Sequence, residues 1–188
     1  MLTEKALLLL HEWVQAESLR RHCYAVSDAL RHFATLQGQD RDLWEAVGLL
    51  HDMDYERYPD YDVSTRTGHP FTGVKWLQEH GWSNEITRAI LTHADYSGEE
   101  RITPLEKTLY AVDELSGFVM AVARVRPRKS LREVDVAAVT KKMKDKAFAR
   151  AVKREDMVRG AEGLGMPLPE VIGHVVTALQ ADAERLGL

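Results

Sequence analysis

Apolar residues in this chain recur every three or four positions, and no stretch alternates apolar with polar residues for long enough to predict a strand. Leu19, Cys23 and Val26 show this helical spacing. Signals for helix ends accompany it. The run 103–106 (Thr-Pro-Leu-Glu) combines a capping box with proline at the first helical position. The sequence therefore predicts an all-α protein.

Capping residues, glycines and prolines divide the chain into about seven to nine helices. Two polar segments, 55–68 and 95–101, are expected to be loops. Helices are expected to begin near Thr3, Ser18, Asp40, Pro70, Ser83, Thr103, Ser130, Asp135 and Pro169.

The length of 188 residues suits one compact domain, which can bury about 70% of the surface that its unfolded form exposes. A composition of 45% hydrophobic and 29% charged residues excludes a mostly disordered chain. No apolar run approaches the roughly 20 residues that span a bilayer, so no membrane association is expected. The single cysteine, Cys23, excludes an internal disulfide and a cysteine-based zinc site, and we expect a cytoplasmic protein.

Charge is distributed unevenly along the chain. Residues 120–160 hold 13 Lys/Arg and 5 Asp/Glu, a net of +8, whereas the whole chain carries −4. This basic segment suits a phosphate-bearing small substrate or a solvated helix face. Nucleic acid is an unlikely partner, because no aromatic residues interleave with the cations and the pI is about 6.1.

The histidines and two aspartates indicate the chemistry. Seven of the eight histidines lie in the first 93 residues, and His51 is followed directly by Asp52 at the end of an apolar run. A carboxylate is rarely buried without a partner. Asp113 and Glu114 stand inside a second apolar helix, and the inward one needs a metal ion or an arginine. Imidazole and carboxylate ligands suit Fe, Mn, Co, Ni or Zn rather than calcium.

The order His22, His51-Asp52 and Asp113 resembles the HD-domain superfamily of metal-dependent phosphohydrolases, whose members are all-α. The resemblance covers about residues 18–125. It adds His69, in a Gly-His-Pro-x-x-Gly run, and His93, at the end of the next helix. Three further segments are similar to an uncharacterised subgroup of predicted HD hydrolases; these are 112–118, 125–127 and 141–148. The expected organisation is a single HD domain over 1–188, with a metal-binding core at about 18–125 and basic C-terminal helices at about 126–188.

The resemblance implies one or two divalent transition metals. Asp52 would bridge them, His22, His51 and Asp113 would complete one site, and His69 and His93 would serve the other. Asp52 and Asp54 are the predicted catalytic residues, with Asp54 orienting water or a ligand histidine. Because guanidinium and ammonium groups match phosphate oxygens, the predicted substrate-binding residues are Arg21, Arg124, Arg126 and Lys129.

The predicted function is hydrolysis of a small phosphoester, a nucleotide or a related phosphorylated metabolite, by a metal-activated hydroxide. Two alternatives stay open. The same ligands suit an HD-type mixed-valent di-iron oxygenase, and the chain suits a non-catalytic metal-binding regulatory module. A homodimer is a possible assembly.

Overall fold

The structure, a computed structural model, describes residues 1–188 and is built from helices without any strand. Nine helices have eight residues or more and a tenth has four, which confirms the predicted all-α fold. The helices are α1 (Leu2–Trp13), α2 (Glu17–Leu36), α3 (Arg41–Leu50), α4 (Phe71–Glu79), α5 (Asn84–Thr92), α6 (Pro104–Arg124), α7 (Val136–Met143), α8 (Arg154–Gly163), α9 (Leu168–Ala181) and α10 (Ala183–Leu186).

Several helices begin where the local sequence predicts. The Asp40 carboxylate caps α3 by accepting from the N–H groups of Asp42 and Leu43. Ser83 caps α5, and Thr103 with Glu106 forms the predicted capping box of α6. Each of these caps satisfies N–H groups that the first turn of a helix leaves without a partner.

The first helix begins earlier than predicted. Thr3 lies inside α1, and its hydroxyl donates to the Asp42 carboxylate at 2.7 Å instead of capping the helix. Pro70 precedes α4 rather than opening it, because the helix starts at Phe71. The ten-residue helix α8 is not among the predicted helices at all.

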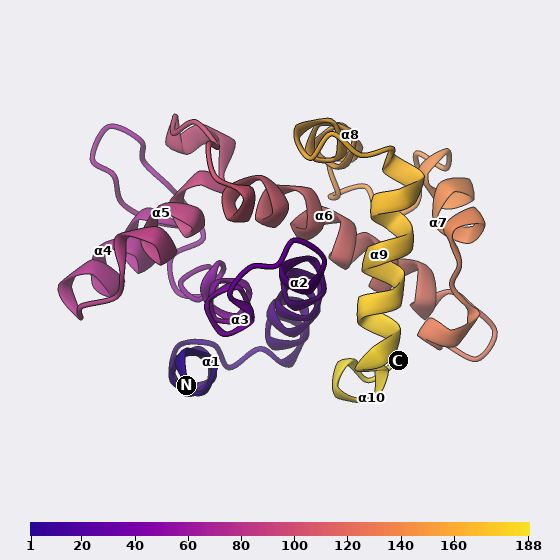
Figure 1. The fold of residues 1–188 in the computed structure, drawn as a ribbon, viewed down its shortest axis with the longest axis horizontal. Helices are drawn as coiled ribbons and strands as arrows, with labels where there is room; N and C mark the ends of the chain where they lie inside the picture. Colours follow the sequence, from indigo (N-terminus) through magenta and orange to yellow (C-terminus); the bar gives the residue numbers. More distant parts are fainter.

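Helix α6 is the longest helix and extends across the molecule between α4 and α5 on one side and α7 and α9 on the other (Figure 1). Its 21 residues span about 31 Å. Phe118 and Leu109 of α6 are fully buried in one apolar cluster that extends from Ala6 in α1 to Leu186 in α10. No helix combines the length and the apolar character that a bilayer crossing requires.

Candidate metal centre

Helices α2 and α3 cross closely, and this crossing sets the first half of the site. A Cβ added to Gly48 of α3 would lie 2.5 Å from the Cα of Ser27 in α2. Only glycine permits so close a backbone approach. The approach brings His22, on α2, within reach of His51, which ends α3.

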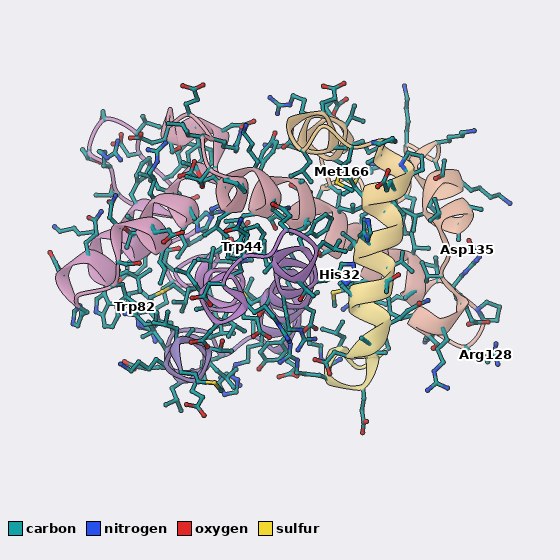
Figure 2. The ribbon with its side chains drawn as sticks, in the orientation of Figure 1. His32, Trp44, Trp82, Arg128, Asp135 and Met166 are labelled. Carbon is teal, nitrogen blue, oxygen red and sulfur yellow. The ribbon has the colours of Figure 1, made fainter.

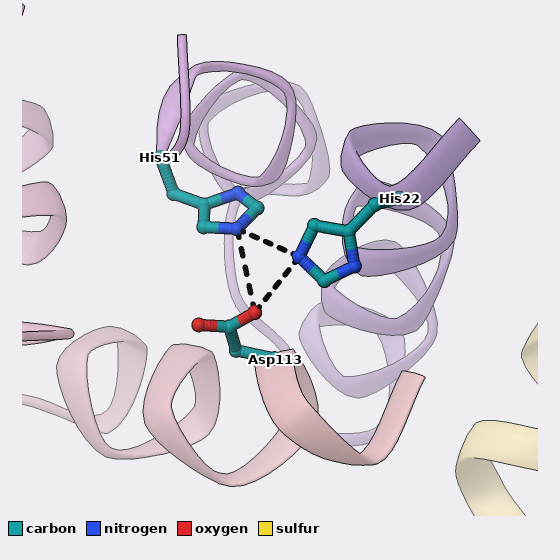
Figure 3. Close-up of side chains that lie close together, drawn as sticks. All are labelled: His22, His51 and Asp113. Carbon is teal, nitrogen blue, oxygen red and sulfur yellow. Dashed lines mark hydrogen bonds and ion pairs between the residues drawn. The ribbon is translucent and has the colours of Figure 1, made fainter. Parts of the chain in front are cut away.

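The three side chains His22, His51 and Asp113 converge from three different helices (Figure 3). His22 Nε2 lies 3.0 Å from Asp113 Oδ1, and His51 Nε2 lies 3.4 Å from the same oxygen. The two imidazole Nε2 atoms are 3.3 Å apart. These atoms together form one group of potential metal ligands.

Asp52, His69 and His93 form a second group beside the first. His69 Nε2 lies 3.4 Å and His93 Nε2 3.6 Å from Asp52 Oδ1. His69 ends the long loop after α3, and His93 ends α5. The second group therefore depends on a loop as well as on helix ends.

The carboxylate of Asp52 faces both groups. Its Oδ2 lies 3.6 Å from His22 Nε2 and 3.5 Å from His51 Nε2, while its Oδ1 faces His69 and His93. Each oxygen therefore points to a different pair of histidines. This arrangement suits a carboxylate that bridges two cations.

The outer nitrogens of three histidines fix the direction of their rings. His51 Nδ1 lies 2.8 Å from the Gly48 carbonyl, and His93 Nδ1 contacts the Ile90 carbonyl. His69 Nδ1 lies 2.8 Å from Asp54 Oδ1. Because a carbonyl or carboxylate only accepts, each Nδ1 donates, and in the neutral ring each Nε2 turns a lone pair toward the site.

In the neutral rings, these lone pairs favour a positive charge between them. The Nε2 atoms of His69 and His93 are 3.2 Å apart, and neither carries a proton to donate when its Nδ1 is protonated. A cation between the nitrogens and the Asp52 oxygen removes the repulsion. The imidazole and carboxylate ligands fit a divalent transition metal such as Mn, Fe, Co, Ni or Zn.

Charges within the cluster shift the pKa values of its members. Burial alone would lower the pKa of His51, but the Asp52 and Asp113 carboxylates outweigh it and raise the pKa to about 9. Burial opposes ionisation of Asp113, yet His51 and His22 hold the pKa of this carboxyl well below its usual range. Asp113 therefore stays ionised and available to a cation.

The site opens into a cavity of about 240 Å³. Lys153 is the single lysine or arginine on its wall, whereas Glu114 and Asp156 add carboxylates. Burial, with the negative charges of Asp113 and Asp156, raises the pKa of Glu114 to about 7. The residues that line the cavity are His22, Asp52, His69, His93, Ala94, Asp95, Tyr96, Tyr110, Asp113, Glu114, Lys153 and Asp156.

The structure does not bring the four predicted phosphate-binding cations to this cavity. Arg21 donates to Glu17 at 3.1 Å on α2, and Arg126 donates to the Glu133 carbonyl at 2.9 Å. Arg124 is exposed at the end of α6, eleven residues or about 16 Å beyond Asp113. Lys129 is exposed in the following loop, beside Arg128, which lies at the edge of the molecule (Figure 2).

Asp54 lies behind His69 and does not face the cavity. It is 1% exposed and does not line the cavity. Its Oδ1 accepts from His69, and its Oδ2 accepts from the Gly73 N–H at 2.6 Å. Asp54 therefore orients a histidine, which is the second role that the sequence suggested for it. Glu56 instead accepts from the N–H groups of Gln15 and Ala16 before α2.

Sequence reasoning did not identify Lys153, Tyr96, Tyr110 or Asp156 as site residues. Tyr96 follows His93 by three residues, and its hydroxyl donates to the His69 carbonyl at 2.9 Å. The short separation of Tyr96 from His93 in the sequence could have identified Tyr96 as a neighbour of the site. Lys153 and Asp156 stand at the start of α8, 40 residues or more after Asp113, where no local pattern links them to the site.

The helical fold and its paired histidine and aspartate ligands define a protein built around a candidate divalent-metal centre. The sequence profile of the HD domain matches residues 19–117, more than half of the chain, and the chain belongs to the HD-domain superfamily of metal-dependent phosphohydrolases. The matched segment contains all six candidate ligands. Neither the curated proteins nor the solved structures contain a match to this chain.

Proposed function

We propose that this chain is a metal-dependent phosphohydrolase that cleaves a small phosphoester, such as a nucleotide or a related phosphorylated metabolite. The observation that carries the proposal is the placement of two ligand groups on the two oxygens of Asp52. A bridging carboxylate between histidine pairs suits two cations held a few ångströms apart. The family supports the reaction class, since most of its members are metal-dependent phosphohydrolases.

His22, His51 and Asp113 would hold one cation, His69 and His93 the other, and Asp52 both. When bound, such a pair lowers the pKa of water toward neutrality and stabilises negative charge on phosphate oxygens. Asp54 keeps the His69 ring turned inward, and Tyr96 fixes the His69 backbone through its hydroxyl. We assign both to positioning.

Lys153 is the residue we propose to hold the phosphate of the substrate. It is the single cation on a cavity wall that otherwise carries carboxylates and histidines. An ammonium group contacts phosphate as a point charge and neutralises the charge that develops on its oxygens. The carboxylates of Glu114 and Asp156 beside it disfavour anionic groups elsewhere along that wall.

Metal content and hydrolysis together test the proposal. Elemental analysis of anaerobically purified protein should give about two transition-metal ions per chain, and Asp113→Ala should lose at least one. His80→Gln is the matched control, because His80 is exposed and stacks on Trp76 away from the cavity. Metal-loaded wild type should release phosphate from a panel of small phosphoesters.

Other results would point to the alternative functions. Coloured, oxygen-sensitive protein that consumes oxygen with an organic substrate and releases no phosphate would favour a mixed-valent di-iron oxygenase. Full metal occupancy without any turnover would favour a non-catalytic module. A metal content of zero after reloading with Mn, Fe, Co and Ni would contradict the metal centre itself.

A further inference from the structure

A second cavity, about 270 Å³ in volume, lies beside the metal cavity and is cationic. Three of the six residues that line it carry positive charge, namely Arg101, Lys107 and Arg159. The others are Tyr110, Gly160 and Gly163, and no carboxylate side chain lines it. Because the two glycines carry no side chain, α8 presents bare backbone along one wall.

Tyr110 lines both cavities, which therefore adjoin at this residue. On α6 the chain passes from Asp113 through Tyr110 to Lys107 in steps of three residues, which keeps neighbours on adjoining faces. These six residues cover about 9 Å along the helix axis. Lys107 and the metal ligand Asp113 therefore lie one small-molecule length apart.

Helix α8 packs against α6 (Figure 1). A Cβ at Gly160 would lie 2.5 Å from the Cα of Ala111, so the two backbones touch. Asp156, at the metal cavity, precedes Arg159 and Gly160, at the cationic cavity, by about one turn. Both helices therefore contribute residues to both cavities, α6 reaching the cationic cavity first along the chain and α8 the metal cavity first.

The charges of the second cavity are only partly balanced. Asp95 accepts from Arg101 through one oxygen and from Arg159 through the other, at 2.5 and 2.7 Å. Asp156 also pairs with Arg159. Lys107 is half-buried and has no ion pair within 4.0 Å. Three cations against two carboxylates leave a net charge of +1, carried by Lys107.

Asp95 holds both guanidinium groups in place without using all their donors. The structure gives no partner to the Nε and Nη1 atoms of Arg159 or to Arg101 Nη1, and Arg101 Nε is buried without a hydrogen bond. Arg101 also lies 3.4 Å above the Tyr110 ring. Arg159 therefore leaves Nε and Nη1 free, Arg101 leaves Nη1 free, and Lys107 adds an ammonium group; guanidinium and ammonium donors bind phosphate oxygens.

We propose that the cationic cavity binds a second phosphate of the substrate while the first phosphate occupies the metal cavity. The inference rests on the proposed phosphohydrolase function and narrows it. The substrate class is a small organic bisphosphate, with a sugar or nucleoside passing over Tyr110 between its two phosphates. Lys107, Arg101 and Arg159 are then specificity-determining residues.

The first test measures binding without any turnover. Isothermal titration calorimetry of the purified full-length protein with inorganic phosphate should show a binding event that depends on Lys107. This event should occur in both metal-free and metal-loaded protein. Lys107→Gln should weaken this event at least tenfold, which corresponds to about 1.4 kcal/mol. Arg159→Gln should weaken the same event. Lys141→Gln is the matched control, because Lys141 is exposed on α7 and lines neither cavity.

The second test uses the manganese-loaded protein hydrolysing p-nitrophenyl phosphate. Fructose 1,6-bisphosphate and fructose 6-phosphate serve as competing inhibitors that differ by one phosphate at the far end. The bisphosphate should bind wild type about tenfold more tightly than the monophosphate. Lys107→Gln should erase this difference and leave inhibition by the monophosphate unchanged.

The two tests separate failure of this inference from failure of the proposed function. Phosphate binding and inhibition that are identical in wild type and in both variants would overturn the bisphosphate inference, while hydrolysis would stand. A Lys107-dependent phosphate site in a protein that hydrolyses no phosphoester would support the site and overturn the phosphohydrolase.

Discussion

Replacing Asp54 by asparagine should weaken one half of the metal centre and spare the other half. Asp54 bonds His69 Nδ1 at 2.8 Å and the Gly73 N–H at 2.6 Å, through separate oxygens. Asparagine keeps the shape but offers a single acceptor oxygen, so one of the two donors loses its partner. None of His22, His51 and Asp113 bonds to Asp54, so their group should keep its geometry.

The size of the effect follows from the lost charge. Burial alone would lower the pKa of His69, but its hydrogen bond to Asp54 and the charge of Asp52 raise it. A neutral amide withdraws the contribution of Asp54, and the imidazole becomes a weaker metal ligand. Hydrogen-bond partners of ligand histidines contribute about 10–100-fold to metal affinity. This range corresponds to about 1.4–2.7 kcal/mol.

Competitive titration of Mn²⁺ against a chromogenic chelator measures both sites in one experiment. Wild type should bind two ions, and Asp54→Asn should keep one affinity and lower the other by about 10–100-fold. Glu56→Gln is the control variant. Glu56 is exposed and lies two residues further along the same loop. Its carboxylate accepts only from the backbone N–H groups of Gln15 and Ala16. The Glu56→Gln variant should bind two Mn²⁺ ions with the wild-type affinities.

Equal weakening of both sites, or of neither, would refute the reasoning. Circular dichroism of Asp54→Asn checks that lower metal affinity does not result from unfolding of the variant. Loss of one buried hydrogen bond costs about 1–3 kcal/mol, which is less than the usual stability of a domain, about 5–15 kcal/mol. The variant should therefore remain folded while one metal affinity falls.

Three further predictions concern other parts of the structure. Gly48→Ala places a methyl group 2.5 Å from the Cα of Ser27, and should lower the free energy of unfolding in urea by about 1–3 kcal/mol. Lys153→Gln should raise KM for p-nitrophenyl phosphate about tenfold with unchanged metal content by elemental analysis. Burial and the neighbouring His174 lower the pKa of His32, which lies on α2 with its Nε2 3.1 Å from Nδ1 of His174 on α9 (Figure 2). The unfolded chain then binds protons more readily, so stability is lost as pH falls through about 6.5, and His32→Gln should reduce that loss in urea titrations at low pH.

The elements that the sequence predicted well are those set by neighbouring residues. Asp40, Ser83 and Thr103 cap their helices because a short polar side chain reaches N–H groups two or three residues ahead. The six proposed ligands were found differently, through their order along the chain and the resemblance to a family. That order implied two groups of ligands, and the structure places the six side chains in two groups.

Long-range contacts account for the elements that the sequence did not predict. Thr3 has the side chain of a helix cap, but Asp42, 39 residues away, binds both its N–H and its hydroxyl. Helix α8 begins at Arg154 without a side-chain cap and contains Gly160 and Gly163, which oppose helix formation. Its contact with Ala111 stabilises it, and no local pattern reports that contact.

The difference between local sequence signals and long-range contacts also explains why the predicted phosphate-binding cations lie away from the cavity and Lys153 lines it. Arg124 and Arg126 follow Asp113 closely in the sequence, but α6 carries each successive residue about 1.5 Å further from the ligand as far as Arg124, and Arg126 lies beyond the end of the helix. Lys153 returns to the cavity because the chain reverses and α8 packs against α6 at Gly160. If this packing positions Lys153, then Gly160→Ala should separate the helices and raise KM for p-nitrophenyl phosphate. The metal content should stay the same, because its ligands come from α2, α6, the ends of α3 and α5 and the loop that carries His69. A loss of metal in that variant would show instead that α8 supports the metal centre itself.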